Sequence, residues 1–169
     1  MRIHITGNAG AGKTTLARRL GVRLGYPVFH LDQVVWRPNW QKTPEEERTL
    51  AIANITSGSE WIIEGVSEAV RSKADLVVFL DTPRHRCFLR CAGRNLPYLF
   101  RSRPELPENC PEILIVFRLI RLIWQFPRLA GHDIRAEAER SRRYVTIRSD
   151  RQSAGLSDEL AERKAACQS

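Results

Sequence analysis

The 169-residue sequence has no long hydrophobic run, no internal repeat and no low-complexity linker. Its most apolar stretch, Ile113 to Phe126, is short and is interrupted by Arg118 and Arg121. Such a stretch is too short and too charged to span a bilayer, so we expect a buried helix there and no membrane partner. The length and the missing linkers favour one domain, residues 1–169, and the hydrophobic content of 43% is typical of a globular fold.

Cysteine is scarce as well, and no Cys-x-x-C pair occurs, which argues against the common zinc frameworks. Cys87 and Cys91 stand at i and i+4, so they share one face of a helix and indicate core packing rather than a metal site. Free thiols favour a reducing compartment, so we expect a cytoplasmic protein. A phosphate-binding motif begins at Gly7, which leaves no room for a signal peptide.

Lysine is rare, with 4 lysines against 23 arginines in a chain of net charge +8. No acidic residue occurs between Thr82 and Pro104, a stretch with six arginines: Arg84, Arg86, Arg90, Arg94, Arg101 and Arg103. Arginine binds phosphate bidentately, so one interpretation is a phosphate-binding surface. A solvated basic face and a nucleic-acid footprint fit the same charge. No helix-turn-helix, zinc finger or aromatic-basic platform is visible, so nucleic acid is possible but not favoured.

What the sequence does contain is a complete phosphate-binding loop. The segment Gly-Asn-Ala-Gly-Ala-Gly-Lys-Thr matches G-x-x-x-x-G-K-[ST] and lies between a strand-like and a helix-like stretch. Its glycines let backbone N–H groups surround a phosphate, Lys13 adds a charge on the β- and γ-oxygens, and the Thr14 hydroxyl can bind Mg²⁺. We therefore expect bound ATP with Mg²⁺. The predicted nucleotide-binding residues here are Gly7, Asn8, Ala9, Gly10, Ala11, Gly12, Lys13, Thr14 and Thr15.

Strand-like segments alternate with helical ones along the chain. The expected strands are Arg2–Thr6, Pro27–Leu31, Trp61–Glu64, Leu76–Asp81 and Tyr144–Arg148. This alternation predicts an α/β fold of the three-layer P-loop NTPase type, with about five parallel strands and helices on both faces.

Proline marks the expected helix starts and an irregular segment. Thr43-Pro44 and Thr82-Pro83 each predict a helix capped by threonine with proline at its first position. Three prolines, Pro104, Pro107 and Pro111, prevent one continuous helix over 99–111. Because long irregular segments in compact domains often cover active sites, we expect a small lid at about 95–125.

Acidic residues stand where the second, third and fourth expected strands end, namely Asp32, Glu64 and Asp81. Ligands of open parallel sheets bind beyond these strand ends, where an acid can hold Mg²⁺ or accept a proton from an attacking hydroxyl. The other interpretation is a helix cap or a structural ion pair. We favour the structural role for Asp81, which precedes a basic helix, and the functional role for the other two, with Glu64 as a metal residue.

Two arginines lie in a stretch that resembles a kinase motif. Asp81-Thr82-Pro83 followed by Arg90-Cys91-Ala92-Gly93-Arg94 is similar to the D-x-P…R-x-x-G-R stretch of adenylate kinases and related nucleotide kinases. The resemblance implies Arg90 at the adenine and Arg94 on the phosphates of ATP. It implies a kinase that moves the γ-phosphoryl group to a small acceptor. The expected catalytic residues are Lys13, Asp32, Arg94, Arg101, Arg103 and Arg121.

Further elements resemble the kinase-like family of DNA topology modulation proteins, in the same order, over residues 1 to about 150. These are His30-Leu31-Asp32 with Trp36-x-Pro38-x-Trp40, Trp61-Ile62-Ile63-Glu64-Gly65, Arg103-Pro104-Glu105, Cys110-Pro111-Glu112 and Arg121-Leu122-Ile123-Trp124-Gln125-Phe126. The family's label leaves a second hypothesis open, a nucleotide-regulated DNA-binding ATPase without small-molecule kinase activity.

The acceptor side departs from both families. Trp36 and Glu68 stand where adenylate kinases place the arginines that hold a monophosphate. The acceptor is therefore left open between a nucleotide and a hydroxyl compound such as a sugar. Trp36, Trp40 and Phe29 fit an aromatic acceptor pocket and fit three core aromatics equally well.

Overall fold

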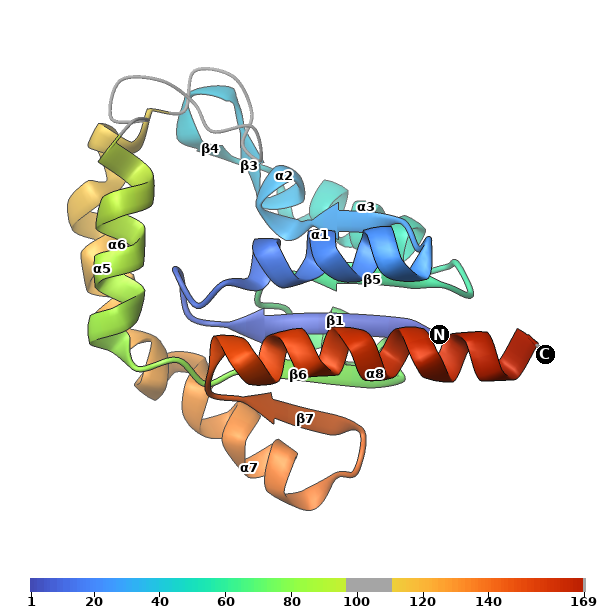
Figure 1. Cartoon of the computed structure of the whole chain (residues 1–169). Helices are drawn as coiled ribbons and strands as arrows, with labels where there is room; N and C mark the ends of the chain where they lie inside the picture. Colours follow the sequence, from blue (N-terminus) through green and yellow to red (C-terminus); the bar gives the residue numbers. More distant parts are fainter. Residues whose placement is uncertain (97–110, 169) are drawn as a thin grey trace.

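The computed structural model describes residues 1–96 and 111–168 (Figure 1). Its main sheet has five parallel strands in the order β2–β5–β1–β6–β7. The strands are β1 (Arg2–Gly7), β2 (Val28–His30), β5 (Trp61–Glu64), β6 (Leu76–Leu80) and β7 (Tyr144–Ile147). All five expected strands are present, each within one residue at either end, and the α/β fold with a five-stranded parallel sheet is confirmed.

Helices cover both faces of this sheet, because side chains of successive strand residues point to opposite faces. On one face, α1 (Lys13–Leu24) and α8 (Asp150–Gln168) pack over Ile3, Ile5 and Val78. On the other face, α3 (Glu45–Ile55), α4 (Glu68–Lys73) and α7 (His132–Arg140) pack over Trp61, Val77 and Phe79. The result is a helix–sheet–helix sandwich, with α1 and α8 in front of the sheet in Figure 1.

Smaller elements gather beyond the carboxyl ends of the strands (Figure 1). After β2 come α2 (Leu31–Val35) and an antiparallel hairpin of β3 (Trp36–Arg37) and β4 (Gln41–Lys42), joined by the 3-10 helix η1 (Pro38–Trp40). After β6 come α5 (Arg84–Asn95), the 3-10 helix η3 (Glu112–Ile115), α6 (Val116–Phe126) and a π-helical turn, η4 (Pro127–Gly131). The centre of the expected lid, residues 97–110 with Arg101 and Arg103, lies outside the described residues.

Two local expectations were wrong. The apolar run is not a buried helix: α6 buries Ile123 and Phe126, whereas Phe117 is 85% exposed and Trp124 45% exposed. The reason is position, since α6 stands at the end of the sheet and packs on α5 and the phosphate loop rather than between layers. Among the helices that the structure describes, none combines the length and the apolar character needed to cross a membrane.

The threonine caps were also wrong. Pro44 and Pro83 themselves occupy the cap positions of α3 and α5, and no side chain caps either helix. Thr82 uses its hydroxyl instead to donate to the carbonyl oxygen of Ala11 at 3.4 Å, which joins the start of α5 to the phosphate loop. A long-range contact therefore replaced the local cap.

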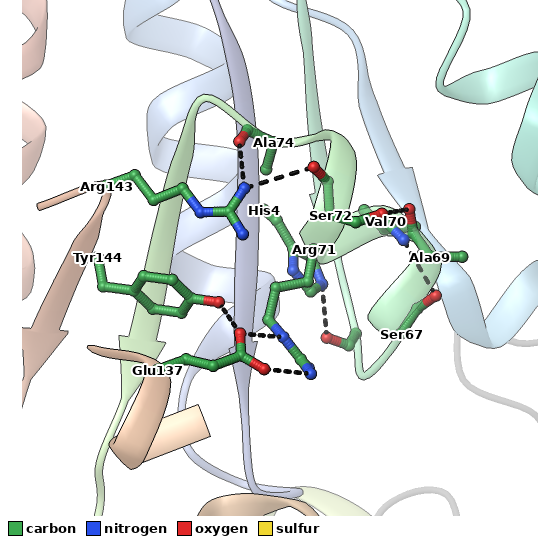
Figure 2. A network of polar contacts seen from close by, with 11 residues as sticks. His4, Ser67, Ala69, Val70, Arg71, Ser72, Ala74, Glu137, Arg143 and Tyr144 are labelled. Carbon is green, nitrogen blue, oxygen red and sulfur yellow. Dashed lines mark hydrogen bonds and ion pairs between the residues drawn. The ribbon is translucent and has the colours of Figure 1, made fainter. Parts of the chain in front are cut away.

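A buried polar network lies on the face covered by α4 and α7 (Figure 2). Arg71, 8% exposed, donates through Nε and Nη2 to the carboxylate of Glu137 at 3.0 and 3.1 Å. The Tyr144 hydroxyl donates to the same carboxylate. Burial alone would raise the pKa of Glu137, but the hydrogen bonds from Tyr144 and Arg71 lower it. The arginine charge is thus neutralised inside the protein.

Candidate nucleotide site

The phosphate loop between β1 and α1 depends on backbone conformations that favour glycine. Gly7, Gly10 and Gly12 have φ values of 149°, 78° and 101°. Gly10 is the most confined, because a Cβ there would lie 2.3 Å from the carbonyl oxygen of Cys87 and 2.8 Å from Sγ of Cys91. Both cysteines are buried in the core behind the loop, as expected, and no cluster of potential metal ligands of three or more His, Cys, Asp or Glu occurs among the described residues.

Lys13 begins α1 and reaches back over the loop. Its Nζ donates to the carbonyl oxygens of Gly7 and Asn8 at 3.1 and 3.0 Å. No acidic residue occupies the first turn of α1, so the positive end of the helix and the lysine charge both face the loop. This arrangement suits an anion.

A cavity of about 650 Å³ opens from the loop. Its walls include the predicted nucleotide residues Gly10 to Thr15, the predicted arginines Arg90 and Arg94, and the segment Ile147–Asp150 at the end of β7. Arg90 Nη2 lies 2.7 Å from the Asp150 carboxylate, so α5 and the start of α8 are joined across the cavity. The structure therefore brings these motif-derived residues into one space, whereas Gly7, Asn8 and Ala9 do not line it, and the individual roles stay predictions.

Four further arginines that the sequence reasoning did not assign also line this cavity: Arg18, Arg19, Arg86 and Arg148. Arg18 lies four residues after Thr14 on α1, so helical spacing from the motif was a signal that could have found it. Arg148 follows β7, and only the strand order shows that this strand end lies near the phosphate loop.

The two expected metal residues meet. Thr14 donates through its hydroxyl to Glu64 Oε1 at 3.2 Å, and His30 Nδ1 lies 2.9 Å from the same oxygen. Burial would raise the pKa of Glu64, but the His30 hydrogen bond, the Lys13 charge and the Thr14 hydrogen bond lower it. A carboxylate held ionised beside a hydroxyl is an oxygen donor set that fits Mg²⁺, which takes few protein ligands and completes its shell with water and phosphate.

The other predicted residues are more scattered. Asp81 is paired with Arg135 at 2.5 Å and Arg148 at 3.6 Å, which fits the structural role that we favoured. Asp32 lies exposed in the first turn of α2. Arg121 lies exposed on α6 and is not among the residues that line the large cavity.

The aromatic trio does not form one pocket. Trp36 and Trp40 meet edge to face with ring centroids 5.4 Å apart, and Arg118 of α6 lies 5.1 Å above Trp36. Phe29 packs instead on the core cluster of the α4 and α7 face. Arg71, which follows Glu68 by three residues on α4, donates to the Glu137 carboxylate.

Comparisons with known proteins agree on the fold. No protein-family model matches the chain. It is 26% identical over 164 residues to a shikimate kinase of Persephonella marina, covering 86% of this chain and 93% of that protein. It is 34% identical over 102 residues to the uncharacterized protein YqaC of Bacillus subtilis, covering 52% of this chain and 57% of YqaC. The chain thus spans little more than half the length of that relative.

Two solved structures extend this likeness over nearly the whole chain. A shikimate kinase from Acinetobacter baumannii in complex with shikimate superposes with a TM-score of 0.55 and 20% identity, covering 97% of this chain and 92% of that one. A gluconokinase from Sinorhizobium meliloti 1021 superposes with a TM-score of 0.52 and 16% identity, covering 95% and 93%. The fold is that of the P-loop kinases. The narrower resemblance to topology modulation proteins stays a prediction.

Proposed function

We propose that the protein is an ATP-dependent kinase that transfers the γ-phosphoryl group of Mg·ATP to a small acceptor. The observation that carries this proposal is the hydrogen bond from Thr14, which lines the arginine-rich cavity, to Glu64 beside the phosphate loop. A buried, ionised carboxylate beside the phosphate-loop threonine is the group that would hold the Mg²⁺ of a bound triphosphate. The similarity to a protein named shikimate kinase supports the same class.

Some of the site residues would neutralise charge during phosphoryl transfer, and others would position the substrates. Mg²⁺, held by Thr14 and Glu64, would neutralise charge on the phosphates when ATP is bound. Lys13 and Arg94 stabilise the negative charge that spreads over the transferred group, because preformed cations act most strongly where water is excluded. Arg90 holds the nucleoside end, and Arg101, Arg103 and Arg121 keep the catalytic role that the sequence predicts for them.

A hydroxyl compound fits the acceptor side better than a nucleoside monophosphate. Arg71 is neutralised by Glu137, and Trp36 and Trp40 occupy the hairpin that follows β2. With a hydroxyl acceptor, Asp32 orients or deprotonates the attacking oxygen. Its exposed side chain lies in the first turn of α2, directly after β2, where an acceptor can reach it. With a phosphate acceptor no base is needed, and Asp32 would only position it.

The test is an assay with Mg·ATP and a panel of hydroxy acids, sugars and nucleoside monophosphates. The expected result is ADP that forms only when one acceptor is present, together with the phosphorylated acceptor by mass spectrometry. Failure with every acceptor, combined with DNA binding that weakens steeply as salt rises, would favour the DNA-binding ATPase instead.

A further inference from the structure

The end of α6 contains a carbonyl group that lacks its usual α-helical donor. In a continuous α-helix the carbonyl oxygen of Ile123 would accept from the N–H of residue 127. Residue 127 is proline, which has no N–H, and the chain passes into the π-helical turn Pro127–Gly131 at this point. Ile123 is 1% exposed, so water does not replace the missing donor.

Asn8 of the phosphate loop supplies the missing donor. Its Nδ2 donates to the carbonyl oxygen of Ile123 at 2.9 Å, across 115 positions of sequence. Its Oδ1 accepts from the backbone N–H of Ala9 at 2.8 Å. Because Asn8 is only 3% exposed, both ends of this amide are committed to the protein, one to the loop and one to α6. Losing the bond would leave buried polar groups unpaired, which is costly.

The other end of the same segment contacts the acceptor-side hairpin. Trp40 donates through Nε1 to the carbonyl oxygen of Pro111 at 3.0 Å, just before η3. The guanidinium of Arg118, in the first turn of α6, lies over the Trp36 ring. The segment from Pro111 to Phe126 therefore spans from the hairpin after β2 to the phosphate loop.

We propose that Asn8 is a positioning residue that couples the phosphate loop to α6, so that a nucleotide on the loop steadies α6. The proposal rests on the proposed function only in that a nucleotide occupies the loop. Coupling of this kind is reciprocal: whatever loosens α6 weakens nucleotide binding by the same factor. Neither the phosphate-loop pattern nor the lid arginines require an asparagine at this position.

The experiment is amide hydrogen exchange of the full chain, alone and with Mg·ADP, read separately for peptides of the phosphate loop and of α6. In the wild type, Mg·ADP slows exchange in both. In Asn8→Ala, exchange in α6 without nucleotide rises by about five-fold, the loss of one hydrogen bond. The reciprocal coupling weakens Mg·ADP binding to this variant, and at saturating Mg·ADP the loop is protected whereas α6 is not.

Pro127→Ala is the second variant, and it lies outside the loop. Alanine restores an N–H that can bond Ile123 within the helix and compete with Asn8. We expect weaker nucleotide-dependent protection of α6 in Pro127→Ala, and no additional loss when Asn8→Ala is combined with it. Asn54→Ala, at an exposed position on α3, is the control and leaves both readouts unchanged.

Protection of α6 by Mg·ADP in Asn8→Ala equal to that in the wild type would overturn the proposal. If Mg·ADP fails to protect even the loop of the wild type, nucleotide binding itself has failed. The nucleotide-free comparison of Asn8→Ala with the wild type then still tests the link to α6, because equal exchange in α6 would mean that Asn8 does not hold it.

Discussion

The two faces of the sheet bury different kinds of side chain. Beneath α1 and α8 the core is apolar, and the charged residues stand at its rim, around the phosphate loop and the cavity. Beneath α4 and α7 the apolar cluster lies beside charged and polar groups: the buried Arg71 is bonded to the partly exposed Glu137, which also accepts from Tyr144, and His4 lies nearby (Figure 2).

This difference suggests that charged residues on the first face serve ligand binding and those on the second face serve stability. Cations at the rim of the first face line the cavity, whereas Arg71 on the second face is bound to the Glu137 carboxylate. Substitutions of charged residues should therefore reduce activity on the α1 side and stability on the α4 side. The following predictions test that division, from the largest expected effect to the smallest.

Lys13→Ala should reduce phosphoryl transfer by about 100- to 1,000-fold, the effect of removing one donor from a developing charge. The free energy of unfolding should change by no more than about 1 kcal/mol, because Lys13 bonds only two loop carbonyls. Initial rates with the identified acceptor and urea unfolding measure the two quantities. Wild-type turnover in this variant would contradict the mechanism.

His4 should make the protein less stable as pH falls from about 6.5 to 4. Burial lowers the pKa of His4 to about 4, so over this range the unfolded chain binds a proton that the folded chain does not. The loss amounts to about 3 kcal/mol from this group. His4→Gln keeps a donor for the Gly65 carbonyl. Between pH 6.5 and 4, the unfolding free energy of this variant should fall by about 3 kcal/mol less than that of the wild type. Parallel pH curves for the two proteins would refute the prediction.

Arg71→Met should lower the free energy of unfolding by about 2 kcal/mol. This is less than for a fully enclosed pair, because the Glu137 side chain is 41% exposed. The matched control is Arg23→Met on the other face, whose partner Asp158 is 55% exposed and whose loss should cost less than about 1 kcal/mol. Equal decreases in the free energy of unfolding for Arg71→Met and Arg23→Met, measured with urea, would contradict the difference between the two faces.

Gly155→Ala should raise the free energy of unfolding by about 0.5–1 kcal/mol, because alanine has a higher helix propensity than glycine in α8. The added methyl group would meet no atom within 4 Å. Gly25→Ala is the comparison: the site is equally open, but its φ is 65°, so that variant should be destabilised. Thermal unfolding separates the two, and a lower melting temperature for Gly155→Ala would show that α8 is not an ordinary helix there.

The strands and the phosphate loop were predictable because their signals are local. The strand Trp61–Glu64 is visible in three consecutive apolar residues and Leu76–Leu80 in five, and the loop needs eight adjacent positions. Glu64 was found because parallel strands present their ends at one edge. The exposed face of α6 was missed, since its composition resembles that of a core helix and only its place at the end of the sheet exposes it.

The amino-acid sequence alone therefore determined the succession of strands and helices along the chain. It also determined the phosphate loop with its glycines and Lys13, because these features depend on neighbours in the chain. The tertiary structure decided which distant groups meet. It paired Thr14 with Glu64, enclosed Arg71 with Glu137, and placed the Asn8 amide against the carbonyl that Pro127 leaves without a donor. Such contacts join residues 50 to 115 positions apart, and their geometry comes from packing, which no local pattern encodes.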